Sequence, residues 1–218
     1  MVTPFRLQLG DAAPRQQSPT TCGSASLTVA RMLADPWFAR WITLGLAREV
    51  DADAGPSAAV EVTASERFAC YEQVVVGRTN ALFGGGGRLQ LPWPRALGTP
   101  PWGARHELEL GIGAPGERFA VRPLRVGSPR SLEREFANLC SRVEPGRPAL
   151  LYVGNRWLPR HVVLVLPATG ASELDVYEPS AGRVVALRRE AFVNRSLALG
   201  GWDVPWAAVW ADRVVNAS

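Results

Sequence analysis

The sequence predicts an α+β fold in which helices come first and a mostly antiparallel sheet follows. In the first part of the chain, apolar and small residues recur at three- and four-residue spacing, which is typical of helices with one buried face. Beyond residue 148, short runs rich in Val, Leu and Tyr are separated by turn residues, which is typical of strands. Helices followed by consecutive strands indicate an α+β arrangement rather than alternating parallel units.

The helices are predicted from their periodicity and their end signals. The first begins at Cys22 and stops at Asp35-Pro36, because a residue before proline disfavours helical backbone. The second contains Gly45, and the last begins at Ser131, which we take as its N-terminal cap. The predicted helices are 22–34, 37–50, 58–76 and 131–143.

The middle of the chain is the part with the weakest pattern. Four glycines at 84–87 break it, and the Pro-, Gly- and Trp-rich segment 91–103 is interpreted as a long loop or lid. Strand-like stretches are predicted at 107–112 and 119–126. We expect one domain, 1–218, with a helical part at 14–79, a loop-rich insertion at 80–130, and a helix followed by the sheet at 131–218.

Five strands are predicted in the last part, and the pairing of two of them has a chemical consequence. Placing the turn between the second and third strands at Thr169 and Gly170 sets Glu178 directly opposite His161 and Asp175 opposite Leu164. Directly opposed residues have Cβ atoms roughly 5 Å apart. A one-residue slip would turn Glu178 to the other face. The predicted strands are 149–153, 161–166, 173–177, 184–187 and 207–214.

Composition excludes several classes of protein. Hydrophobic residues make up 47% and charged residues 20%, as in an ordinary globular domain. The net charge is +4 and all 24 basic residues are Arg, but they are scattered, so no nucleic-acid-binding surface is predicted. No apolar run is long enough to span a bilayer, and the start lacks a signal peptide pattern. We expect a cytoplasmic protein, or one exported without a classical signal peptide.

Cys22 is the strongest candidate for a reactive group. It is the first residue of a predicted helix, where unpaired N–H groups and the helix dipole stabilise a thiolate. The small residues Gly23 and Ser24 let a substrate carbonyl approach the sulfur, and the Cys22 N–H can hold an oxyanion. Gln16 or Gln17 would supply a second oxyanion donor. Cys70 and Cys140 are interpreted as structural; the odd number of cysteines, without a Cys-x-x-Cys pair, predicts neither a disulfide framework nor a zinc site.

A thiolate nucleophile needs a base, and the chain has two histidines. His161 begins an apolar strand, where its ring can emerge at the end of a sheet. Glu178, across the predicted hairpin, would orient the second ring nitrogen and fix its tautomer. His106 has no comparable set of partners and is interpreted as a surface or structural residue.

Together these motifs resemble a known family. The pattern Gln16-x5-Cys22-Gly-x-Ala-x-Leu, then His161-Val-Val-Leu-Val, then Glu178-Pro-x-x-Gly, is similar to the stand-alone relatives of bacterial double-glycine leader (bacteriocin-processing) peptidases. These belong to the papain-like cysteine peptidase superfamily. The resemblance covers roughly 14–34 and 147–193 and implies a papain-like fold, with Gln16 rather than Gln17 at the oxyanion. The family usually has Asp-Pro where this chain has Glu178-Pro179.

The predicted function is a thiol hydrolase that cleaves an amide or isopeptide bond of a peptide or protein through a thioester, with no metal or organic cofactor. Two alternatives stay open. A transglutaminase or glutamine deamidase would use the same triad, because water or an amine can resolve the same thioester. A catalytically inactive relative would serve as a binding module. The sequence indicates no oligomeric state.

Overall fold

The computed structural model describes residues 3–46, 62–169 and 173–212, and these form helices followed by a six-stranded antiparallel sheet. The predicted α+β class is therefore confirmed. The helices are α1 (Cys22–Ala34), α2 (Pro36–Leu44), α3 (Ala64–Asn80), α4 (Pro101–Gly111), α5 (Pro129–Arg142) and α6 (Arg189–Val193), with short 3-10 turns η1 (Gly85–Gly87) and η2 (Arg95–Leu97). The strands are β1 (Arg118–Pro123), β2 (Ala149–Gly154), β3 (Pro159–Pro167), β4 (Leu174–Glu178), β5 (Arg183–Leu187) and β6 (Val204–Asp212).

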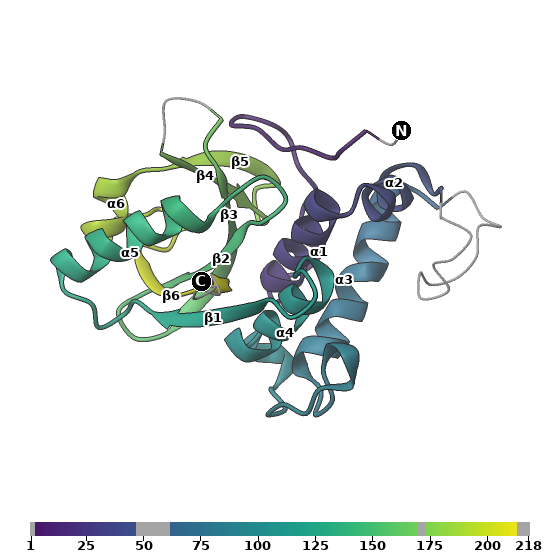
Figure 1. The fold of residues 1–218 in the computed structure, drawn as a ribbon, viewed down its shortest axis with the longest axis horizontal. Helices are drawn as coiled ribbons and strands as arrows, with labels where there is room; N and C mark the ends of the chain where they lie inside the picture. Colours follow the sequence, from purple (N-terminus) through teal and green to yellow (C-terminus); the bar gives the residue numbers. More distant parts are fainter. Residues whose placement is uncertain (1–2, 47–61, 170–172, 213–218) are drawn as a thin grey trace, which may run out of the picture.

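The sheet has the strand order β1-β6-β2-β3-β4-β5, and helices cover both of its faces. Figure 1 shows α1 between the sheet and α3, with α5 and α6 on the far side of the sheet. Strand residues alternate between the two layers as the pleat requires. On β3, Val162 and Leu164 pack into the core shared with α1, whereas Val163 and Val165 pack into the core shared with α5.

Helix α1 is buried on all sides, and its composition explains how it can be. Every residue from Cys22 to Ala30 is buried, the condition of a helix that neighbours surround completely. Small side chains at 23–26 let it approach β3 closely. The Ser26 hydroxyl donates to the Val162 carbonyl at 3.3 Å, and the Thr28 hydroxyl donates to the Ser24 carbonyl at 2.8 Å. Its buried hydroxyls therefore have partners.

The bounds of α2 and α3 differ from the predicted ones. Helix α2 ends at Leu44 because Gly45 takes the left-handed conformation (φ 74°) and closes the helix. The rest of the predicted 37–50 helix, from 47, lies outside the described residues. Helix α3 begins at Ala64, where Thr63 and Glu66 form a reciprocal capping box, and it continues to Asn80 rather than Val76. The predicted start at 58 falls outside the described residues.

The prediction was wrong in the middle of the chain. The stretch 107–112, expected as a strand, lies almost wholly in α4, which also takes the end of the expected loop 91–103. Helix α4 packs against α1, α3 and β1. The strand expected at 119–126 is β1. Ser128, not Ser131, caps α5: its hydroxyl accepts from the Ser131 N–H at 3.3 Å, and Pro129 opens the helix.

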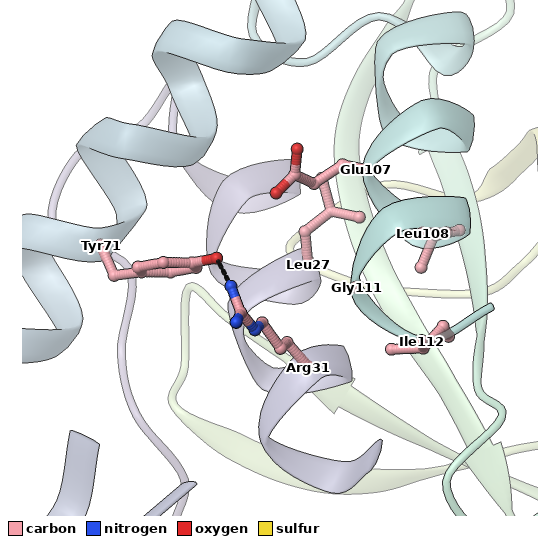
Figure 2. Close-up of a pocket in the computed structure, with 7 residues that line it drawn as sticks. All are labelled: Leu27, Arg31, Tyr71, Glu107, Leu108, Gly111 and Ile112. Atoms are coloured by element: carbon pink, nitrogen blue, oxygen red, sulfur yellow. Dashed lines mark hydrogen bonds between the residues drawn. The ribbon is translucent and has the colours of Figure 1, made fainter. Parts of the chain in front are cut away.

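A buried polar cluster fastens α1, α3 and α4 together on the side away from Cys22. Figure 2 shows Arg31 of α1 pointing to the Tyr71 hydroxyl of α3, with Glu107 of α4 beside them. Arg78 forms an ion pair with Glu107 at 3.4 Å. Burial raises the pKa of Glu107, and Arg78 opposes that rise. The remaining space, about 10 Å³, is that of a single water molecule, so this is a structural joint rather than a ligand site.

Among the described helices, none is long and apolar enough to cross a membrane.

Candidate functional site

Cys22 stands at the first turn of α1, at the point where the helical layer meets the sheet. Its N-terminal neighbour Thr21 is the residue preceding the helix. The side chain is 4% exposed and belongs to the core that α1 shares with β3. Its side chain lies close enough to the imidazole of His161 to raise the pKa of that ring. The structure thus brings together two predicted residues that lie 139 positions apart in the sequence.

His161 lies near the start of β3, and its ring has a partner on each side. The Nε2 atom lies 2.6 Å from Oε1 of Glu178, a length typical of a charge-assisted hydrogen bond. Because Nε2 faces Glu178, Nδ1 is the nitrogen left for Cys22. The ring is buried, so these two contacts set both its orientation and its tautomer.

The register between β3 and β4 is shifted by two residues from the predicted one. Leu164 pairs with Tyr177 and Leu166 with Asp175, so Glu178 lies diagonally across from His161 rather than directly opposite. A shift of two preserves the face, because side chains alternate with period two. A Glu side chain spans the diagonal. Asp175, expected opposite Leu164, accepts instead from the Thr169 N–H and hydroxyl at 2.9 and 2.6 Å.

Glu178 is held as a carboxylate by the turn that follows it. Oε1 accepts from the Ser180 N–H at 3.0 Å, and Oε2 accepts from the Ser180 hydroxyl at 2.7 Å and the Ala181 N–H at 3.0 Å. Burial raises the pKa of Glu178, but hydrogen bonds from His161 and Ser180 outweigh it and lower the pKa to about 2.

The same contacts favour the charged form of His161. Burial alone lowers the pKa of the imidazole, yet the hydrogen bonds with Cys22 and Glu178, together with their negative charges, raise it to about 9. The arrangement therefore favours a protonated imidazole beside the Cys22 side chain.

Gln16 and Gln17 differ in their surroundings. Gln16 is half-buried; its Nε2 donates to the Ser18 carbonyl at 2.7 Å, and its backbone N–H donates to the Pro179 carbonyl at 2.9 Å. That backbone bond ties the segment before Cys22 to the turn that holds Glu178. Gln17 is exposed, and its amide donates to the Arg15 carbonyl at 3.3 Å. Of the two, Gln16 faces inward.

Two neighbours of the triad were not predicted from the sequence. Gly200, with φ of 57°, lies flat against the imidazole: a Cβ built there would be 2.7 Å from Cδ2 of His161. Thr99 covers the start of α1, since a Cβ on Gly23 would lie 2.6 Å from its side chain, and its carbonyl accepts from the Tyr152 hydroxyl at 3.1 Å. Both contacts join segments far apart in the sequence, which leave no local pattern.

Glu72 of α3 is a third unpredicted residue of this region. Its side chain is fully buried, and neither carboxylate oxygen has a close hydrogen-bond partner among the described residues. The Thr21 hydroxyl and the Gln17 N–H face it at longer range. These two groups lower the pKa of Glu72, but burial raises it by more, so that the pKa is about 7. A buried acid thus lies beneath the loop that precedes Cys22.

The remaining candidates lie apart from this cluster. Cys70 is exposed and Cys140 half-buried, and both thiols are free. His106 is buried, with Nδ1 3.0 Å from Oε1 of Gln90, which fits the structural role expected for it and not a surface one. Trp157 is 69% exposed and stacks under the Arg156 guanidinium. The described residues contain no group of three or more His, Cys, Asp or Glu side chains that could hold a metal ion.

Comparison with known proteins gives a distant structural likeness. No protein-family model and no curated protein sequence matches the chain. Among solved structures, the avirulence protein AvrPphB of Pseudomonas matches 94% of this chain and 97% of its own, with 14% sequence identity and a TM-score of 0.46.

The contact between Gly200 and the His161 ring gives the first prediction. Gly200→Ala should lower the pKa of His161 below its value of about 9, because the added methyl must displace the imidazole from Cys22 and Glu178. Gly201→Ala is the matched control: its φ of 82° makes alanine equally strained, but nothing lies within 4 Å of the added Cβ. NMR titration of His161 in both variants, with melting temperatures alongside, separates ring displacement from backbone strain. An equal change of the His161 pKa in the two variants would contradict the prediction.

Glu72 gives the second prediction, a dependence of stability on pH. Because its folded pKa is about 7 and an ordinary Glu titrates near 4.5, folding favours the protonated form, and stability falls as pH rises from about 4.5 to 7. The full effect is about 3 kcal/mol. Glu72→Gln should remove it, so the variant gains stability over wild type at pH 8 but not at pH 4.5.

Urea unfolding at both pH values measures this difference. Glu133→Gln, on the exposed surface of α5, should keep the wild-type pH dependence. A Glu72→Gln variant whose stability changes with pH as the wild type's does would refute the assignment.

Proposed function

We propose that this chain is a thiol hydrolase of papain-like design that cleaves an amide bond in a peptide or protein. The observation that carries the proposal is the continuous chain of contacts from the Cys22 sulfur through the His161 ring to the Glu178 carboxylate. A core histidine would need one partner; a ring with a thiol on one side and a fully hydrogen-bonded carboxylate on the other has the parts of a nucleophile, a base and an orienting group. The order of these parts along the chain is the one that the resemblance to papain-like peptidases implies.

The proposed first half-reaction forms a thioester. The Cys22 thiolate attacks the substrate carbonyl carbon, and the Cys22 N–H at the start of α1 and the Gln16 amide stabilise the oxyanion. Gln16 Nε2 has two hydrogens, and the Ser18 carbonyl takes one of them, which leaves one for a ligand. His161 then gives its Nδ1 proton to the leaving amine as the C–N bond breaks.

The second half-reaction consumes water. His161, now neutral, removes a proton from water as the hydroxide adds to the thioester carbonyl. The C–S bond breaks, the carboxylic acid leaves, and the proton returns the site to its thiolate–imidazolium form. Glu178 stays ionised throughout, because its pKa of about 2 lies far below neutral pH. Its role is to orient the ring and stabilise the imidazolium.

The structural parts are assigned accordingly. We place the predicted helical part, 14–79, and the helix-containing middle segment, 80–130, on the side of the substrate that stays bonded to sulfur. The part 131–218 supplies His161 and Glu178. An amine in place of water would make the same site a transglutaminase, and a glutamine side chain as substrate would make it a deamidase.

The reactivity of Cys22 tests the proposal. At pH 7, iodoacetamide should alkylate Cys22 faster than Cys70, although Cys22 is 4% exposed and Cys70 is a surface residue, because only Cys22 has an imidazolium partner. Mass spectrometry of the peptides gives the rate for each thiol. Cys22→Ala should reduce cleavage of a mixed peptide library by roughly 10³-fold or more, whereas Cys70→Ala and Cys140→Ala retain it.

Two outcomes would change the conclusion. If Cys22 reacts no faster than Cys70, the enzyme proposal fails and a binding module remains. If Cys22-dependent ammonia release from glutamine peptides replaces backbone cleavage, the triad assignment stands but the reaction is deamidation or amine transfer.

A further inference from the structure

The proposed chemistry divides the substrate between two walls of the site. The leaving amine must reach the proton on His161, so the leaving half of the substrate passes over the β3 side. The acyl half stays bonded to the Cys22 sulfur and extends toward the other wall, to which α3 and the segment 93–99 contribute. A pocket on that second wall would bind a side chain of the acyl half and so determine which substrates are accepted.

Such a pocket is present beside the start of α1. It has a volume of about 210 Å³, enough for one amino-acid side chain. Thr21, the residue before Cys22, lines it, and so does Gly98, the neighbour of the Thr99 that covers Gly23. Thr21 is thus adjacent in the chain to Cys22, and Gly98 is adjacent to a residue that contacts the start of α1. Its other lining residues are Ser18, Thr20, Gln73, Val76, Asn80 and Arg95.

The pocket has a polar lining with positive charge only. Asn80 is occupied with structure, since its amide donates to the carbonyls of Trp93 and Gly98 at 3.3 and 2.8 Å and so braces the segment that carries Arg95. Arg95 and Gln73 are exposed, and neither side chain bonds to another described residue. None of the lining residues is acidic; the nearest carboxyl along α3, Glu72, is buried beneath the loop instead.

We infer that this pocket binds an acidic side chain of the substrate, on the acyl side of the cleaved bond, through the Arg95 guanidinium. A free guanidinium beside a free carboxamide is a donor set that fits a carboxylate. A lysine or arginine side chain would find a like charge and no acceptor of opposite charge there. This inference rests on the proposed hydrolase function and makes Arg95 its specificity residue.

The test compares the rates at which peptides are cleaved by the wild type and by variants in which the charge of the pocket is reversed or removed. Fluorogenic peptides carry Glu, Gln or Lys at each of the four positions on the acyl side. Wild type should cleave the best Glu peptide about tenfold faster than its Lys counterpart, and 0.5 M NaCl should reduce that ratio. Arg95→Glu should reverse the preference toward Lys, and Arg95→Gln should abolish it. Arg134→Gln, on α5 across the sheet, should leave it unchanged.

The outcomes are distinguishable from those of the function itself. If wild type shows Cys22-dependent cleavage but Arg95→Glu and Arg95→Gln keep the wild-type preference, the pocket assignment is wrong and the hydrolase stands. A wild-type preference for Lys over Glu at every acyl-side position would likewise show that the pocket assignment is wrong, while the hydrolase stands. If no peptide is cleaved in a Cys22-dependent way, the hydrolase proposal fails and this inference falls with it.

Discussion

The site depends on one buried side chain, the imidazole of His161, which is held between a thiol from the helical layer and a carboxylate from the sheet. Burial by itself would make this ring neutral. The two partners reverse that tendency and raise its pKa to about 9. The backbone around the ring serves the same purpose: the Ser180 turn fixes the carboxylate, and Gly200 leaves room for the ring only because it lacks a side chain.

The other requirement is that the first turn of α1 reach the start of β3. A helix with bulky residues on every side could not lie this close to a sheet and to two further helices at once. The small residues after Cys22 solve this problem, and their hydroxyl groups find partners in the Val162 carbonyl and within the helix. Thr99 then closes over Gly23, and its segment leads directly into the pocket that contains Arg95. The same short stretch of sequence thus determines how α1 packs, how a substrate reaches the sulfur, and which residues form the wall that faces the substrate.

The parts of the structure that sequence predicts are those with local signals. Helix α1 matches its predicted bounds because Asp35-Pro36 is a local stop. Glu178 stays on the predicted face although the register moved, because strand periodicity is insensitive to a shift of two. The alternating stretch 107–112 was misread as a strand because Glu107 and Glu109 are buried, each with an arginine from another part of the chain, Arg78 and Arg88. Such long-range pairing, like the approach of Gly200 to His161 and of Glu72 to Thr21, leaves no trace in the spacing of residues.

The site depends on a protonated His161 imidazole beside the Cys22 sulfur, and a titration of His161 measures this pairing directly. The chain has two histidines, so NMR signals of the imidazole protons are resolvable, with His106→Gln used for assignment. His161 should titrate near pH 9 in the wild type and at distinctly lower pH in Cys22→Ala, which removes the interaction of the ring with the sulfur. A wild-type His161 that titrates near 6.5, or one whose titration is the same with and without the Cys22 sulfur, would contradict the pairing on which the site is built.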